Sequence, residues 1–314
     1  MKMKKKLSIG VDIGGSHISC AACDLNLKKY LPETFAENDL DNKAGAEEII
    51  GIWSKTIAKT IALAGEENIA GIGFAMPGPF EYDKGIARFT SENDKYENIY
   101  GLNVSEAIRK SLALPAEFPV RYINDATAFA LGEDWIGKAR SVSRSLSITL
   151  GTGFGSAFLK NSLPVVEGDT VPDMGCVWHL PFENGIADDY FSTRGFLNRY
   201  KEQTGKQLKG VKELAQMASS NETAKALFDD FGLKLSMFLK PWFEKFGVEM
   251  LVIGGNISNA FSLFGKSMND YLSAEQVVVK IEVSELKETA ALIGSAVLVD
   301  DEFYAKVAPL LPLM

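Results

Sequence analysis

The chain has 314 residues, of which 46% are hydrophobic and 24% are charged, a balance that is ordinary for a globular protein. Its formal net charge of −8 argues against a nucleic-acid partner, because phosphate backbones need a basic surface. The acidic balance leaves room for a small anionic cofactor, since backbone dipoles and a metal ion bind phosphate even on an acidic protein.

The N-terminal sequence MKMKKKLSIGVDIGG begins like a signal peptide, with lysines followed by apolar residues. Asp12 interrupts the apolar run after about five residues, which is too short for the core of a signal peptide. No stretch approaches the roughly 18 apolar residues that span a bilayer. The cysteines Cys20, Cys23 and Cys176 are odd in number, so we expect reduced thiols in a cytoplasmic protein without a membrane partner.

Strands and helices alternate along the chain, which predicts an α/β fold. The expected strands cover residues 7–13, 69–76, 119–123 and 250–253, and the expected helices cover residues 44–64, 126–136, 221–246 and 287–299. Pro241 is expected to kink or end the third of these helices. A strand–glycine–strand pattern occurs near residues 7–25 and again near 146–160, which indicates two similar domains. The polar but aromatic stretch 89–103 is expected to form a functional loop.

Three glycine-rich turns each follow an apolar strand, at Asp12-Ile13-Gly14-Gly15-Ser16, at Gly151-Thr152-Gly153 and at Gly254-Gly255. Glycine permits positive φ and lets a ligand approach the backbone N–H groups closely. Two such turns facing each other would hold the β- and γ-phosphates of a nucleotide, and the third would pack against the base and ribose. Taken singly, each turn also fits a hairpin or a bulge.

Asp125 lies where an expected strand ends and an expected helix begins. An aspartate at this position is a good helix cap. It is equally suited to act as a general base that accepts a proton from a sugar hydroxyl as the hydroxyl attacks a γ-phosphate. Asn124 beside it would then bind an adjacent sugar hydroxyl through its amide. The local sequence leaves both interpretations open.

Five segments in order resemble the ROK family (repressors, open reading frames and sugar kinases): DIGGSHI, GIGFAMPGPF, INDATAFALGE, LGTGFGSAF and LVIGGNIS. The resemblance implies a two-domain actin/hexokinase/Hsp70-like (ribonuclease H-like) ATPase fold with a nucleotide cleft between the domains. It also implies ATP and Mg²⁺ as cofactors, a hexose or N-acetylhexosamine as substrate, and a homodimer. We expect the smaller domain in residues 1–123 plus 300–314 and the larger in residues 124–299.

The same resemblance assigns the catalytic base to Asp125 and sugar binding to Asn124, with transfer expected at the 6-hydroxyl. Asp12 matches the family's aspartate near Mg²⁺, which it would hold through water; stabilising its own turn is the other interpretation. The implied nucleotide-binding residues are Gly14, Gly15, Ser16, Gly151, Thr152, Gly153, Gly254 and Gly255. Gly78, in the turn Pro77-Gly78-Pro79, is an expected sugar-binding residue.

The segment after the second phosphate turn departs from the family pattern. Where many members have Glu-x-Gly-His, this chain reads Cys176-Val177-Trp178-His179, so a cysteine replaces a sugar-binding glutamate while the histidine is kept as a sugar ligand. No zinc-ligating cysteines follow, and we expect no structural zinc site. Asp188 matches the family's second sugar-binding glutamate, and Asp189 is the alternative if the alignment shifts by one residue.

Losing a carboxylate that binds two sugar hydroxyls would cost a few kcal/mol of binding, on the order of 1–3 for each buried group left unpaired. Either another residue replaces it, or the sugar differs from glucose, or the protein binds without turnover. Candidates for the replacement are Glu167 and the loop residues Ser91, Glu92, Asn93 and Asp94.

The resemblance favours an ATP-dependent kinase over three alternatives. The turn GTGFGSAF and the missing zinc cysteines are similar to polyphosphate glucokinases, which makes polyphosphate the alternative donor. Repressors of the family carry an N-terminal helix-turn-helix, for which a first strand near residue 7 leaves no room. A catalytically weak or inactive sugar- and nucleotide-binding protein is the remaining alternative: Cys176 favours it, and Asp12, Asn124 and Asp125 count against it.

Overall fold

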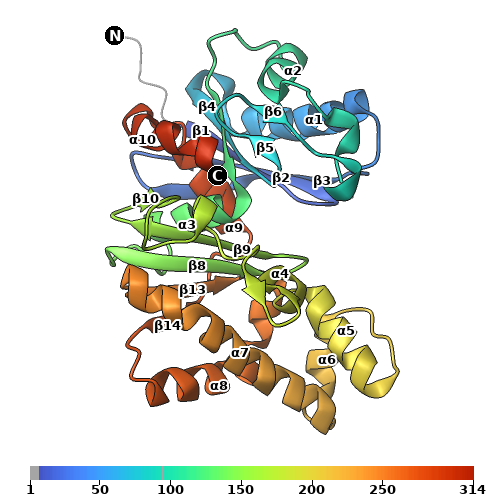
Figure 1. Cartoon of the computed structure of the whole chain (residues 1–314). Coiled ribbons are helices and arrows are strands. Elements are labelled where there is room, and N and C mark those ends of the chain that lie inside the picture. Colours follow the sequence, from blue (N-terminus) through green and yellow to red (C-terminus); the bar gives the residue numbers. More distant parts are fainter. Residues whose placement is uncertain (1–6, 94) are drawn as a thin grey trace. The chain divides into compact units, whose positions relative to one another are not determined.

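The computed structural model describes residues 7–93 and 95–314 of the chain. The chain forms two compact units, one comprising Met1–Gly137 with Glu288–Met314 and the other comprising Lys138–Lys287 (Figure 1). Each unit consists of a mixed β-sheet covered by helices, as the alternating pattern predicted. No helix within the described residues is long and apolar enough to cross a membrane.

The first unit contains a five-stranded sheet with the strand order β3-β2-β1-β4-β7. Its strands are β1 Leu7–Ile13, β2 His17–Asp24, β3 Lys29–Asp39, β4 Ile69–Met76 and β7 Val120–Asn124, and a small hairpin pairs β5 Phe80–Glu81 with β6 Ile86–Ala87. Strand β1 is antiparallel to β2 and parallel to β4, which is in turn parallel to β7. The carboxyl ends of β1, β4 and β7 therefore meet at one edge of the sheet.

The helices of the first unit pack against this sheet and against one another. They are α1 Ala46–Ala64, α2 Val104–Ser111, α3 Asp125–Trp135, α9 Thr289–Val297 and α10 Asp301–Val307, with 3₁₀ turns at Glu66–Asn68, Ser91–Asn93, Glu97–Ile99 and Ala308–Leu313. Helix α1 buries Ile49, Trp53 and Ile57 and is capped by Gly65, as the helical spacing predicted. The closing helix expected at 287–299 is α9, whereas α10 after it was not predicted.

Helices α3 and α9 touch backbone to backbone. A Cβ atom added to Gly294 would lie 1.8 Å from the carbonyl oxygen of Ala128, and one added to Gly132 would lie 2.0 Å from that of Ala290. Only glycine permits this approach. Because α9 also packs on β1 and β4, both helices belong to the first unit. The chain thus divides after residues 137 and 287, rather than after 123 and 299 as expected from the sequence.

The second unit repeats the strand arrangement of the first, with the order β10-β9-β8-β13-β14. Its strands are β8 Arg144–Leu150, β9 Phe154–Lys160, β10 Leu163–Pro164, β13 Met250–Gly254 and β14 Lys280–Val283, and a hairpin pairs β11 Pro181–Phe182 with β12 Gly185–Ile186. The hairpin β8–β9 is antiparallel, whereas β13 runs parallel to β8 and β14. The doubled strand–glycine–strand pattern therefore predicted a real structural repeat.

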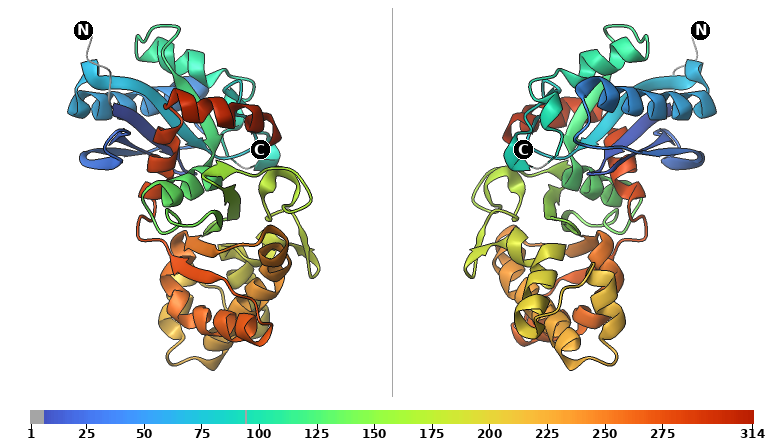
Figure 2. Two further views of the ribbon diagram at one scale, coloured as in Figure 1. Left: turned by 90° about the vertical axis from the view of Figure 1, so that its left-hand side faces the viewer. Right: turned by 90° about the vertical axis from the view of Figure 1, so that its right-hand side faces the viewer.

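The helices of the second unit surround an aromatic core that contains Phe191, Phe196 and Phe231. They are α4 Ala187–Tyr190, α5 Thr193–Thr204, α6 Val211–Met217, α7 Glu222–Phe246 and α8 Phe261–Ala274, with 3₁₀ turns at Asp173–Gly175 and Asn256–Ala260. Helices α7 and α8 lie side by side on one side of the second sheet (Figures 1 and 2). Helix α7 does not end at Pro241, which is exposed within it.

Candidate active site

Two carboxylates lie at the edge where the parallel strands of the first unit end. Asp12 is near the end of β1, and Asp125 is the first residue of α3, directly after β7. Burial, and after it the negative charges of Asp125 and Glu288, together raise the pKa of Asp12 to about 7. The edge of the sheet therefore concentrates negative charge that a bound cation would neutralise.

The helix cap at this edge is Asn124 rather than Asp125. The side-chain oxygen of Asn124 accepts the backbone N–H groups of Ala126 and Thr127 at 3.1 and 3.2 Å, and its amide donates to the hydroxyl of Tyr82 at 3.3 Å. One oxygen of Asp125 accepts the N–H of Ala126 at 2.8 Å. Since Asn124 takes the capping role, the sequence-based reason for treating Asp125 as a mere cap is weakened.

The first glycine turn, Gly14 to Ser16, is held by hydrogen bonds to its carbonyl groups. The hydroxyl of Tyr96 donates to the oxygen of Gly14 at 2.5 Å, and the side-chain amide of Asn42 donates to that of Gly15. Gly15 and Ser16 are exposed, and a Cβ atom on Gly15 would meet no atom within 4 Å. The turn thus leaves open space beside its backbone, as a phosphate site needs.

Tyr96 is a residue of this site that the sequence reasoning missed. It lies in the stretch 89–103, where we expected a functional loop, and its ring packs against Trp53 and Phe89 with centroids 5.6 and 5.5 Å apart. Its backbone N–H donates to the carbonyl of Asn42 at 2.9 Å. Tyr96 therefore joins this loop to the first glycine turn. Of the expected loop residues, Ser91 to Asn93 form a 3₁₀ turn, and Asp94 lies outside the described residues.

The second glycine turn connects β8 to β9 in the second unit. The N–H of Gly151 donates to the carbonyl of Gly153 at 3.0 Å, and the oxygen of Gly151 accepts both the N–H and the hydroxyl of Thr193, at 2.8 and 2.9 Å. Thr152 and Gly153 are exposed at the tip. The second turn resembles the first: in each, a neighbouring segment donates hydrogen bonds to carbonyl oxygens of the turn, and the residues at the tip are exposed.

Asp188 lies against the second turn. One of its oxygens accepts the N–H of Phe154 at 2.6 Å, and the other forms an ion pair with Arg194. Arg194 also pairs with Asp189 at 3.1 Å, and 56% of the Asp189 side chain is exposed against 17% for Asp188. Both oxygens of Asp188 are thus engaged within the unit. The sequence reasoning did not foresee the pairing with Arg194, although an arginine six residues downstream was visible.

The segment that departs from the family pattern brings three side chains together. The sulfur of Cys176 lies 3.8 Å from Nδ1 of His179, and the rings of Trp178 and His179 meet edge to face at 5.4 Å. Burial raises the pKa of the Cys176 thiol and outweighs the lowering by a hydrogen bond from Trp178, so that the pKa is about 11. Glu167, the expected replacement for the missing carboxylate, is exposed and makes no hydrogen bond or ion pair with any described residue.

The remaining expected residues lie in tight backbone turns. Gly254 ends β13, and Gly255 has φ +76°; a Cβ atom there would lie 2.4 Å from the carbonyl oxygen of Leu150. Only glycine fits this position, and the 3₁₀ turn Asn256–Ala260 and helix α8 follow it. Gly78 is exposed after β4, with the hydroxyl of Tyr82 3.5 Å from its Cβ position.

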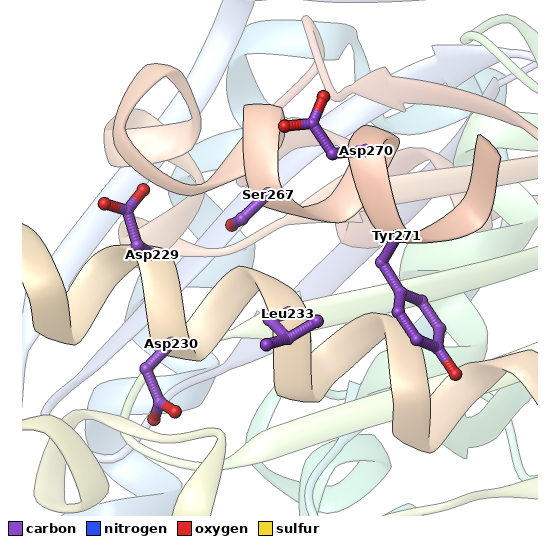
Figure 3. Close-up of a pocket in the computed structure, with 6 residues that line it drawn as sticks. All are labelled: Asp229, Asp230, Leu233, Ser267, Asp270 and Tyr271. Atoms are coloured by element: carbon purple, nitrogen blue, oxygen red, sulfur yellow. The ribbon is translucent and has the colours of Figure 1, made fainter. Parts of the chain in front are cut away.

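A separate hollow of ≈ 460 Å³ lies between α7 and α8 and contains none of the expected site residues. It is lined by Asp229, Asp230, Leu233, Ser267, Asp270 and Tyr271 (Figure 3). Asp230 accepts the hydroxyl of Tyr190 at 2.5 Å and pairs with Lys234 at 3.4 Å, and Asp270 pairs with Lys266 at 2.5 Å. Two of the three carboxylates are therefore neutralised by neighbours, and the hollow is not the candidate active site.

The carboxylates of the first unit suit a magnesium ion better than a metal ion whose ligands are all protein side chains. Among the described residues, no group of three or more His, Cys, Asp or Glu side chains is arranged to hold a metal. Mg²⁺ keeps several waters and needs only one or two carboxylates, with substrate phosphates completing its shell. The charge gathered around Asp12, Asp125 and Glu288 is of this kind.

The chain is similar to known proteins over nearly its whole length. A model of the ROK family matches residues 8–302. The chain is 28% identical to the glucokinase of Thermotoga maritima, over 95% of this chain and 99% of that protein. It is 25% identical to the N-acetyl-D-glucosamine kinase of Haemophilus influenzae, over 92% of this chain and 98% of that protein.

Solved structures show the same fold. The ROK hexokinase of Thermus thermophilus matches with a TM-score of 0.74 and 19% identity, covering 92% of this chain and 96% of that one. A ROK family glucokinase from Streptomyces griseus, solved with glucose and AMPPNP, matches with a TM-score of 0.70 and 19% identity, covering 93% and 98%. The fold is thus the actin/hexokinase-like ATPase fold. Because the family model spans nearly the whole sequence, the chain belongs to the ROK family.

Proposed function

We propose that this protein is an ATP-dependent kinase that transfers the γ-phosphoryl group to the 6-hydroxyl of a hexose or an N-acetylhexosamine. The full-length likeness to a glucokinase and to an N-acetyl-D-glucosamine kinase supports this class of substrate. The observation that carries the proposal is the pair of carboxylates, Asp12 and Asp125, at the carboxyl edge of the first sheet.

In this proposal Asp125 is the general base. As the sugar oxygen attacks phosphorus, its proton passes to the carboxylate of Asp125, the new O–P bond forms, and the bond to the ADP leaving group breaks. Asn124 fixes the start of α3 by capping it, which holds the Asp125 backbone in place. The Asn124 amide, which donates to Tyr82, also lies beside Asp125 and is the proposed contact for an adjacent sugar hydroxyl.

Phosphoryl transfer depends mostly on positioning and on neutralising charge. We assign the phosphates of ATP to the backbone N–H groups at the open tips of the two glycine turns, at Gly15 and Ser16 and at Thr152 and Gly153. Gly254 and Gly255 are assigned to the adenosine. Asp12 would hold Mg²⁺ through water, and the ion, when bound, would neutralise phosphate charge.

A catalytically inactive binding protein is the second candidate, and Cys176 is the observation that favours it. A thiol is a weak hydrogen-bond partner compared with the carboxylate found in many family members. The retained Asp12, Asn124 and Asp125 favour the kinase.

The test is ADP release with Mg·ATP across a panel of hexoses and N-acetylhexosamines, read by a coupled assay and compared with polyphosphate as donor. Sugar-dependent release supports the kinase and identifies its acceptor. Measurable ATP binding without turnover of any acceptor would instead support the binding protein.

A further inference from the structure

Cys176, Trp178 and His179 form a contact cluster without a carboxylate. The thiol approaches Nδ1 of His179 at 3.8 Å, the indole hydrogen-bonds to the thiol, and the indole and imidazole rings meet at 5.4 Å. Since burial raises the pKa of the thiol to about 11, Cys176 is uncharged at neutral pH. The cluster therefore offers a ligand an aromatic face and a weak hydrogen-bond partner in place of an anionic oxygen.

Trp178 is exposed although its backbone is fixed. Its carbonyl oxygen accepts the N–H of Asp188 at 3.0 Å, and Asp188 in turn accepts the N–H of Phe154 beside the second glycine turn. Yet 42% of Trp178 is exposed, whereas Trp53 is fully buried. The exposed indole, in a segment whose backbone is hydrogen-bonded to Asp188, therefore presents an aromatic surface that a ligand can cover.

The indole of Trp178 is better suited to contact a ring of the ligand than to bind a hydroxyl group. The face of an indole carries negative partial charge and attracts polarised C–H groups, such as those on the flat side of a pyranose, and it also packs against aromatic rings. A site built around a carboxylate rejects acceptors that lack the bound hydroxyl by orders of magnitude. With a thiol in that place, a substituent on the sugar meets no such penalty.

We propose that the cluster is a subsite for the substituent of a glycoside, so that the preferred acceptor is a sugar whose attached ring lies on Trp178. The attached ring is a second pyranose or an aromatic aglycone. This inference rests on the proposed kinase function and on the resemblance that makes His179, next to Trp178, a ligand of the acceptor sugar. Trp178 is then a residue that determines specificity, and it takes no part in the chemical step.

The experiment compares kcat/KM for glucose, methyl glucoside, phenyl glucoside and a glucose disaccharide, with both anomers of each glycoside. We expect the ring-bearing acceptors to be preferred, and Trp178→Gly to reduce that preference about tenfold, the effect of one aromatic contact. Trp178→Phe keeps a ring and should keep most of the preference. Met174→Gly is the matched control, because Met174 is 41% exposed in the same segment and has φ +62°; its preference should match the wild type.

Tryptophan fluorescence supplies a readout that does not depend on turnover. Phenyl glucoside should change the emission of the wild-type protein, and Trp178→Phe should abolish the change. Turnover of glucose with an acceptor preference that Trp178→Gly leaves unaltered would overturn the subsite and leave the kinase intact. If no acceptor is phosphorylated, the proposed function fails, and the fluorescence titration alone decides the subsite: a change lost in Trp178→Phe supports it, and no change in the wild type rejects it.

Discussion

Replacing Tyr96 by phenylalanine isolates the hydrogen bond that joins the loop 89–103 to the first glycine turn. The substitution removes the hydroxyl that donates to the oxygen of Gly14 at 2.5 Å. The ring contacts with Trp53 and Phe89 remain, because phenylalanine keeps the same ring. Burial, and secondarily the charge of Asp12, raise the pKa of Tyr96, so the hydroxyl is protonated and able to donate at physiological pH.

The expected effect follows from the value of one hydrogen bond. A hydrogen bond inside a protein contributes about 0.5–1.5 kcal/mol to stability. If this bond orients the turn for phosphate binding, the same free energy appears as weaker binding of Mg·ATP, which corresponds to a KM for ATP higher by about two- to tenfold. The turnover number should change little, because Tyr96 does not contact Asp125 through any hydrogen bond among the described residues.

The assay measures ADP release as a function of ATP at saturating sugar, together with thermal unfolding. Tyr122→Phe is the matched control: Tyr122 is buried in the same unit, and its hydroxyl accepts from Ser105 at 3.1 Å, away from the glycine turn. Both variants should lose similar stability, but only Tyr96→Phe should raise the KM for ATP. Equal KM values in Tyr96→Phe and the wild type, with stability lowered, would refute the positioning role.

Two further predictions concern packing and thiol chemistry. Gly294→Ala should destabilise the first unit by about 1–3 kcal/mol or more, because its Cβ would lie 1.8 Å from the oxygen of Ala128; denaturant unfolding that matches the wild type would contradict the backbone contact. Cys176 has a pKa raised from 9.0 to about 11. Compared with an unperturbed thiol, its thiolate fraction at pH 8 is therefore about a hundredfold smaller. Because a thiolate of higher pKa is more nucleophilic, the rate of its alkylation should be only about tenfold lower. Its iodoacetamide reaction in the native protein should accelerate up to pH 11, and a plateau near pH 9 would show that burial does not perturb the thiol.

The strands and glycine turns could be predicted because their signal is local. Apolar runs such as IAGIGFAM end at glycine or proline, and Ile69–Met76 is the strand they predicted. Strand β3 could not be predicted in this way: Lys29–Asp39 is polar, contains a proline and is mostly unburied. It forms because β2 offers it a pairing edge, which is a tertiary effect.

The contacts that complete the site span long sequence separations. Tyr96 and Gly14 lie 82 residues apart, and nothing in either segment identifies the other. The same holds for α3 and α9, because Gly132 and Gly294 are explained only by the close backbone contact between the two helices. This contact assigns both helices to the first unit, so the domain boundaries expected from the sequence differ from those of the structure. Asn124 and Asp125 were identified from sequence, but only the hydrogen bonds reveal which of them caps the helix.

Sugar-dependent ADP release by Asp125→Asn tests the central claim most directly. Asparagine can still accept the N–H of Ala126 through its side-chain oxygen, so the fold and ATP binding should persist. If Asp125 removes the proton from the sugar hydroxyl, kcat should fall by about 10²–10⁴-fold. A folded Asp125→Asn protein that turns over at the wild-type rate would contradict the account.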